Sequence, residues 1–210
     1  MTAGSVTAGI GTAGIVIAID GPAGAGKSTV AKALAERLGA SLLDTGAMYR
    51  AVTLLALRSG VDLSNGDKLA ALARAMTFET GHRFILDGED VSAAIRSPDV
   101  DAAVSEVSAH PSVRGELVRR QREWVAANRC AIVEGRDIGS VVLPDARLKV
   151  FLTADPDVRA ERRSDPEVTR RDEKDSRRAA SPLVIADGAI VVDSTKRSVD
   201  EVVEEVLAHL

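Results

Sequence analysis

The residues best suited to chemistry form one glycine-rich stretch near the start of the chain. Residues 21–28 read G-x-x-x-x-G-K-S, with Gly21, Gly26, Lys27 and Ser28 in the fixed positions. Glycines let successive backbone N–H groups turn inward around an anion. A lysine at this position can reach the β- and γ-phosphates of a nucleotide, and the serine hydroxyl can ligate Mg²⁺. The spacing therefore predicts a phosphate-binding loop, or P-loop.

The segments on either side of this loop support the prediction. The run 15–20 is apolar and rich in β-branched residues up to its final Asp20, which is typical of a strand buried on both faces. Val30, Leu34 and Leu38 follow with helical spacing, and a helix that begins here adds partial positive charge to the site. Both flanks and the Lys-Ser pair disfavour a chance glycine-rich turn. The expected ATP contacts are Gly21, Pro22, Ala23, Gly24, Ala25, Gly26, Lys27, Ser28 and Thr29.

Composition limits the classes of protein that need to be considered. The chain has 210 residues, which suits one α/β domain with a modest insertion, and its net charge of −4 disfavours nucleic acid or an anionic membrane as a partner. Cys130 is the single cysteine, so no intramolecular disulfide can form, and the three histidines are too scattered to suggest a metal site. No apolar run is long enough to span a bilayer. We expect a cytoplasmic monomer.

The order of the remaining elements predicts the fold class. Residues 1–14 lack periodicity and the pattern of a signal peptide, so we expect a disordered leader. Strands separated by helices imply a parallel, doubly wound sheet, with functional sites at the carboxyl ends of the strands. We therefore predict an α/β P-loop NTPase fold, with a five-stranded parallel sheet flanked by helices. The further strands are expected at 40–43, 130–133, 148–152 and 190–192.

One segment interrupts this alternation. Residues 61–104 suggest a helix near 69–76, strands at 77–79 and 83–86, and a hairpin turn at Asp87-Gly88 with Val91 in the return strand. We interpret this segment as an inserted subdomain. The core domain then comprises 15–60 and 105–210, and a lid lies at about 155–180.

Two groups of arginines need interpretation. Arg119, Arg120 and Arg122 alternate with glutamates on a predicted helix, which favours a solvated helix face over a nucleic-acid surface. Arg171, Asp175 and Arg178 follow at i, i+4 and i+7 and share one helix face. They are either exposed salt bridges or, beside a P-loop, groups that close over a transferring phosphoryl. Arg50 and Arg136 are further candidates because each follows the end of a predicted strand.

The chain resembles the bacterial cytidylate kinases, within the nucleoside monophosphate kinase group. The resemblance covers nearly everything from Ile15 to Leu210, and the T-G-A-x-Y-R and E-G-R-D-I-G stretches are more specific than the P-loop. Thr45 stands where the family often has Ser, and the hydroxyl is kept. The family's nucleotide-binding insert corresponds to 61–104. The matching stretches are 17–28, 44–50, 133–139, 144–146 and 193–195.

The resemblance implies the reaction and the roles of the site residues. ATP and CMP or dCMP would give ADP and CDP or dCDP, with Mg²⁺ held by Ser28 and the phosphates. Lys27, Arg136 and Arg178 would be catalytic. Ser105, Arg114 and Asp137 would meet cytosine, and Tyr49, Arg171 and Asp175 would lie near the sugar. The full set implied for CMP is Thr45, Tyr49, Arg50, Ser105, Arg114, Arg136, Asp137, Arg171, Asp175 and Arg178.

One segment departs from the family pattern. Only residues 164–169 lie between Arg163 and Arg170, where the family usually has a longer arm of the lid. Either the lid is truncated or the sequence omits residues of it, and omission is favoured because mobile lids are where order is lost. The departure leaves open whether Arg159, Arg162, Arg163 and Arg170 contact ATP.

Other functions remain as alternatives. A different small-molecule kinase of this fold, for UMP, shikimate or dephospho-coenzyme A, would not need the insert or the T-G-A-x-Y-R stretch. A GTPase switch would carry an Asn-Lys-x-Asp motif, which the sequence lacks. A nucleic-acid binder would need more aromatic residues than one Tyr and one Trp to stack bases.

Overall fold

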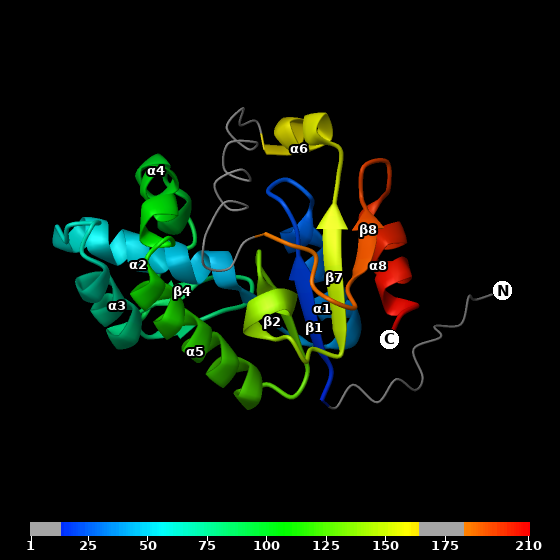
Figure 1. The fold of residues 1–210 in the computed structure, drawn as a ribbon, viewed down its shortest axis with the longest axis horizontal. Helices are drawn as coiled ribbons and strands as arrows, with labels where there is room; N and C mark the ends of the chain where they lie inside the picture. Colours follow the sequence, from blue (N-terminus) through cyan, green and yellow to red (C-terminus); the bar gives the residue numbers. More distant parts are fainter. Residues whose placement is uncertain (1–13, 164–182) are drawn as a thin grey trace.

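The computed structural model describes residues 14–163 and 183–210 (Figure 1). Its centre is a five-stranded sheet in the order β2 (Ser41–Asp44), β6 (Ala131–Glu134), β1 (Val16–Asp20), β7 (Leu148–Thr153) and β8 (Ile190–Asp193). All of the neighbouring pairs are parallel, which confirms the predicted sheet. The P-loop follows β1, the central strand, so it lies at the carboxyl edge of the sheet.

Alternate residues of β1 face two separate hydrophobic cores, because side chains alternate along a strand. Ile17 and Ile19 pack in the core that contains α1 (Lys27–Leu38) and α8 (Val199–Leu207). Ala18 packs in the other core, which contains α2 (Thr45–Ser59) and α5 (Pro111–Ala127). Helices therefore cover both faces of the sheet, as its apolar strands require. Helix α6 (Pro156–Arg163) follows β7.

The segment 61–104 contains a helix and a small antiparallel sheet, as predicted, and shares the core of α2 and α5. Val91 comes just after the return strand β5, and its backbone N–H donates to the carbonyl of Phe84. The boundary at 104 lies inside α4, so the division into domains stays a proposal. The elements are α3 (Gly66–Ala75), β3 (Phe78–Glu79), β4 (Ile85–Leu86), β5 (Glu89–Asp90), η1 (Ala94–Arg96) and α4 (Pro98–Val107).

Arg119 and Arg122 of α5 are exposed, as expected for a solvated face, whereas Arg120 is partly buried. Arg119 does pair with Glu116 and Glu123 at the surface. Arg120, however, lies 5.1 Å from the ring centroid of Phe78 and donates to a carbonyl of α3. Arg122 donates to the carbonyls of residues 141 and 142 at 2.9 Å. These two side chains thus join α5 to its neighbours, which the sequence pattern did not reveal because their partners lie far away in the sequence.

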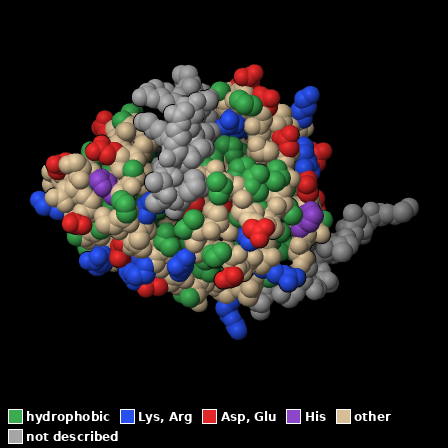
Figure 2. Space-filling view, in the orientation of Figure 1, with side chains coloured by type: hydrophobic (Ala, Val, Ile, Leu, Met, Phe, Trp, Pro, Cys, Tyr) green, Lys and Arg blue, Asp and Glu red, His purple; other side chains and the backbone are tan. Residues whose placement is uncertain are grey.

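The surface drawn in Figure 2 carries acidic and basic side chains interspersed with one another. Among the described residues, no helix combines the length and apolarity needed to cross a membrane. The predicted leader at 1–14 lies outside the described residues except for Gly14.

The tight contact between the P-loop and β7 can be tested at Gly21. A Cβ at Gly21, whose φ is +147°, would lie 2.0 Å from the carbonyl oxygen of Leu152, so Gly21→Ala forces the backbone apart. Gly60 also has positive φ, but a Cβ there meets nothing within 4 Å. We expect Gly60→Ala to lower the free energy of unfolding by about 1 kcal/mol. Gly21→Ala should lower it by at least about 2 kcal/mol more, and urea unfolding of both variants measures the difference. Equal losses would contradict this contact.

Candidate active site

The P-loop opens on a cavity of about 610 Å³ at the carboxyl edge of the sheet. Two predicted ATP contacts, Gly21 and Pro22, are not among its lining residues, because Gly21 packs against β7 and the Pro22 carbonyl accepts from Lys27 Nζ. Arg171, Asp175 and Arg178 lie outside the described residues. The predicted residues that line the cavity together are Ala23, Gly24, Ala25, Gly26, Lys27, Ser28, Thr29, Thr45, Tyr49, Arg50, Ser105, Arg114, Arg136 and Asp137.

The P-loop backbone is shaped by its glycines and by α6. Gly24 and Gly26 have φ values of +78° and +90°, which glycine adopts without strain. A Cβ at Gly24 would lie 2.5 Å from the carbonyl oxygen of Arg159, so the loop and α6 are in close contact. Arg159 itself is buried and donates to the carbonyl of Ala23 at 3.2 Å. Both the glycines of the loop and its contacts with α6 therefore fix the backbone conformation of the loop.

Arg162 is the lid arginine that the structure places in the cavity lining. Its guanidinium donates to the hydroxyl of Ser194 at 3.0 Å and to the Ser194 carbonyl at 2.8 Å. The same hydroxyl donates to the carbonyl of Ala25 in the P-loop at 2.9 Å. Arg162 and Ser194 therefore join α6, β8 and the P-loop. The Arg163 side chain and Arg170 lie outside the described residues.

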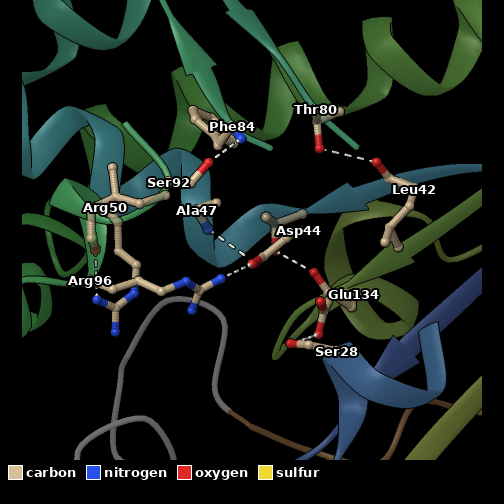
Figure 3. Close-up of polar contacts among 12 residues, drawn as sticks. Ser28, Leu42, Asp44, Ala47, Arg50, Thr80, Phe84, Ser92, Arg96 and Glu134 are labelled. Carbon is tan, nitrogen blue, oxygen red and sulfur yellow. Dashed lines mark hydrogen bonds and ion pairs between the residues drawn. The ribbon is translucent and has the colours of Figure 1, made fainter. Parts of the chain in front are cut away.

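Glu134, at the end of β6, faces the P-loop serine (Figure 3). The Ser28 hydroxyl donates to Glu134 Oε2 at 2.9 Å, while Glu134 Oε1 is buried and has no hydrogen-bond partner among the described residues. Burial, and then the negative charge of Asp44, raise the pKa of Glu134 to about 7, although Lys27 and Ser28 oppose the shift. The sequence analysis gave this carboxylate no role.

This pair of oxygen ligands suits a hard divalent cation. Mg²⁺ in phosphoryl-transfer sites is commonly bound by few protein oxygens together with water and substrate phosphates. No cluster of three His, Cys, Asp or Glu side chains that could hold a metal occurs in the described ranges. The Ser28 hydroxyl and the unpartnered oxygen of Glu134 therefore fit Mg²⁺ that arrives with a nucleotide, rather than a metal held by the protein alone.

A buried ion pair also lines the cavity. Arg114 Nη2 donates to Asp137 Oδ2 at 2.5 Å, and both residues are only 6% exposed. The guanidinium of Arg114 also lies 5.6 Å from the ring centroid of Tyr49. Arg114 and Ser105 come from α5 and α4, whereas Asp137 follows β6. The fold thus brings together residues that the sequence separates widely.

Two further arginines, Arg50 and Arg96, line the same cavity (Figure 3). Arg50 is nearly buried and donates to the carbonyl of Ile95 at 2.9 Å and to Asp101 at 2.6 Å. Arg96 pairs with Asp44 at 3.2 Å, and Asp44 also caps α2 by accepting from Ala47 N–H. The sequence analysis missed Arg96 because it lies in the insert, at the end of a short turn without a motif.

Asp20, the last residue of β1, is a second carboxylate without a role in the sequence analysis. Its two oxygens accept from the backbone N–H groups of Ile138 and Gly139 at 2.7 Å each, and the residue is 3% exposed. Burial, and to a lesser extent the charge of Asp137, raise its pKa to about 6, even though both N–H groups and Lys27 stabilise the ionised form. The signal available in the sequence was a charged residue at the end of an apolar strand.

Comparisons with known proteins agree with this arrangement. The sequence model of the family described as cytidylate kinase matches residues 17–210. This chain belongs to the cytidylate kinase family. The Mycobacterium leprae protein named cytidylate kinase is 48% identical over 212 positions, with 93% of each chain covered. That of Caldanaerobacter subterraneus is 48% identical, with 91% of this chain and 92% of the relative covered.

Among solved structures, a gluconokinase from Sinorhizobium meliloti matches with a TM-score of 0.51 at 18% identity, and 93% of this chain and 91% of that one are covered. At this level of identity the likeness shows the fold alone. The P-loop kinase fold predicted from the sequence is therefore confirmed, and membership of the family makes this protein an ATP-dependent nucleoside monophosphate kinase.

The raised pKa of Asp20 predicts how stability changes with pH. The native pKa of about 6 exceeds the ordinary value of 3.8, so stability from the neutral carboxyl is fully present below about 3.8 and is lost as the pH rises through 6. Between pH 4 and pH 7, the unfolding free energy of the wild type should fall relative to Asp20→Asn by on the order of 2 kcal/mol. Urea unfolding of the wild type and of Asp20→Asn between pH 4 and pH 7 measures this difference in unfolding free energy. A constant difference would show that Asp20 does not titrate abnormally.

Proposed function

We propose that this chain transfers the γ-phosphoryl group of ATP to CMP or dCMP, giving ADP and CDP or dCDP. The observation that carries the proposal is a cavity lined both by the P-loop and by the buried Arg114–Asp137 pair. Phosphoryl transfer requires two phosphates held in line and their charge neutralised, with little covalent help from the protein. A cavity lined by several cationic side chains and by a pair able to read a base meets that requirement.

ATP would occupy the half of the cavity formed by the P-loop. The backbone N–H groups of residues 23–29 and the N-terminus of α1 would bind its phosphates. Lys27 Nζ, which now contacts the Pro22 carbonyl at 2.9 Å, would move to the β- and γ-phosphates. Ser28 and Glu134 would hold Mg²⁺, which, when bound, neutralises charge on the phosphates. We propose that Arg162 and Ser194 border the ATP end, since both line the cavity beside the loop.

CMP would occupy the half formed by α2, α4, α5 and the segment after β6. We propose that Asp137 and Arg114 read cytosine with Ser105, and that Tyr49 packs near the sugar. Arg50 and Arg136 would hold the acceptor phosphate, and the Thr45 hydroxyl, which donates to the Glu134 carbonyl at 2.7 Å, would border it. From the resemblance we add Arg171 and Asp175 near the ribose and Arg178 at the phosphates, all three outside the described residues.

The remaining properties are also proposals. The alignment with the Mycobacterium leprae protein is longer than this chain although it covers only 93% of it, so that relative carries residues without a counterpart here. We propose that some of them belong to the lid arm at 164–169. We further propose that the protein acts as a cytoplasmic monomer, without nucleic-acid or membrane partners.

A coupled assay of ADP release across several acceptors tests the proposed function. CMP, dCMP, UMP, shikimate and dephospho-coenzyme A would be compared at equal concentrations, with ATP and Mg²⁺ present. The highest kcat/KM is expected for CMP or dCMP. A higher value for any of the other acceptors would contradict the proposal.

Lys27 provides the first prediction from this function. Lys27→Ala should leave the fold intact and lower kcat by about 10²-fold or more, because the transferring phosphoryl loses a cation in a site shielded from water. Lys32, an exposed lysine of the same helix, supplies a matched control in Lys32→Ala. The measurement is kcat with CMP, together with the melting temperature of each variant. Near-normal turnover by folded Lys27→Ala would refute its role.

Asp137 provides the second prediction from the proposed function. An ionised carboxylate accepts and cannot donate, so it suits the N4 amino group of cytosine and opposes the O4 of uracil. Asp137→Asn can turn an NH₂ toward O4, and the ratio of kcat/KM for CMP over UMP should fall about tenfold or more. Exposed Asp145, changed to Asn, is the control. If both activities fall equally, Asp137 only orients Arg114, and the base is read elsewhere.

A further inference from the structure

The segment 135–137 carries two of the proposed acceptor contacts and is fixed at both ends by β1. At its start, the Gly135 N–H donates to the carbonyl of Ile19 at 2.9 Å. At its end, the next two backbone N–H groups, those of Ile138 and Gly139, donate to the carboxylate of Asp20 at 2.7 Å. Consecutive residues of the strand that leads into the P-loop therefore set the position of the segment that bears Arg136 and Asp137.

The Asp20 carboxylate acts in place of an ordinary helix cap. Ile138 and Gly139 begin the short helical segment η2 (Ile138–Val142), and the first N–H groups of a helical segment lack partners within it. Such groups are commonly satisfied by the side chain of the preceding residue. Here that residue is Asp137, whose side chain makes no capping bond and instead pairs with Arg114. Asp20 supplies the acceptors that Asp137 does not.

The segment is also closely packed at its start. A Cβ at Gly135 would lie 2.6 Å from the side chain of Ile138 and 2.7 Å from the Thr45 hydroxyl. Asp20 is itself almost fully buried, so solvent cannot readily replace its two hydrogen bonds. Its carboxylate is the acceptor that the fold provides at this point.

We infer that Asp20 is a positioning residue for acceptor selection. By capping η2 from the neighbouring strand, it leaves the carboxylate of Asp137 available to Arg114 and to the base, and it holds Arg136 in register with the P-loop. This inference rests on the proposed function. Without Asp20, Asp137 turns to cap its own helical segment, and the cavity loses the group that distinguishes cytosine from uracil.

Asp20→Asn tests the inference, because its amide can accept one N–H and presents a donor to the other. Amide hydrogen exchange at Ile138 and Gly139 should become faster. The KM for CMP should rise about tenfold, the CMP-over-UMP ratio of kcat/KM should fall, and the KM for ATP should change less than about twofold. Asp62→Asn is the control, since Asp62 also accepts from a backbone N–H but lies in an exposed turn.

A double variant separates positioning from general support of the fold. If Asp20 acts through Asp137, Asp20→Asn should add little to the loss of base selectivity already caused by Asp137→Asn. Additive losses, equal increases in the KM values for ATP and CMP, or unchanged exchange at Ile138 and Gly139 would each overturn the inference. If Asp20→Asn does not fold, Asp20→Glu, which keeps both acceptors on a longer side chain, should show the same pattern, and unchanged CMP kinetics would overturn the inference.

The proposed function and the inference fail in different ways. A wild-type protein that does not phosphorylate CMP would refute the function, and the exchange measurement would still test the capping. A wild-type protein that is active on CMP, together with an Asp20→Asn variant of unchanged CMP kinetics, would support the function and overturn the inference.

Discussion

The parallel pairing of β1 with β6 is the constraint on which the rest of the site depends. It places Ile19 beside Glu134, so the segments that leave the two strands emerge side by side. One segment is the P-loop, and the other carries Arg136 and Asp137. Because the two come from neighbouring strands of one buried sheet, backbone hydrogen bonds set the separation between the P-loop and the segment 135–137.

This arrangement buries three carboxylates, which is unfavourable unless they are hydrogen-bonded or paired with a positive charge. Asp20, Glu134 and Asp137 are each no more than 6% exposed. Asp20 is stabilised by backbone N–H groups, Asp137 by a guanidinium and Glu134 in part by a hydroxyl. Glu134 keeps one oxygen without a partner, which is unusual for a buried group and common where a ligand is to arrive.

The fold and the identity of the P-loop were predictable because they depend on local patterns. The apolar run 15–20, the G-x-x-x-x-G-K-S spacing and the alternation of strands and helices are properties of short windows of sequence. Arg96, Asp20 and Glu134 were not assigned because their importance comes from contacts over long sequence separations. Asp20, for example, meets Ile138 through the register of two strands, which no local pattern specifies. The partners of Arg120 and Arg122 were not predicted for the same reason.

The scarcity of aromatic residues gives this cavity a natural reporter. Tyr49 is the sole tyrosine of the chain, lines the cavity and lies under the guanidinium of Arg114. The sole tryptophan, Trp124, packs at the core shared by α2, α5 and the insert. The ultraviolet absorbance and fluorescence of the unlabelled protein therefore contain one tyrosine signal from the cavity and one tryptophan signal from the insert side. Events at the two places can be followed separately in the same sample, without attaching a dye.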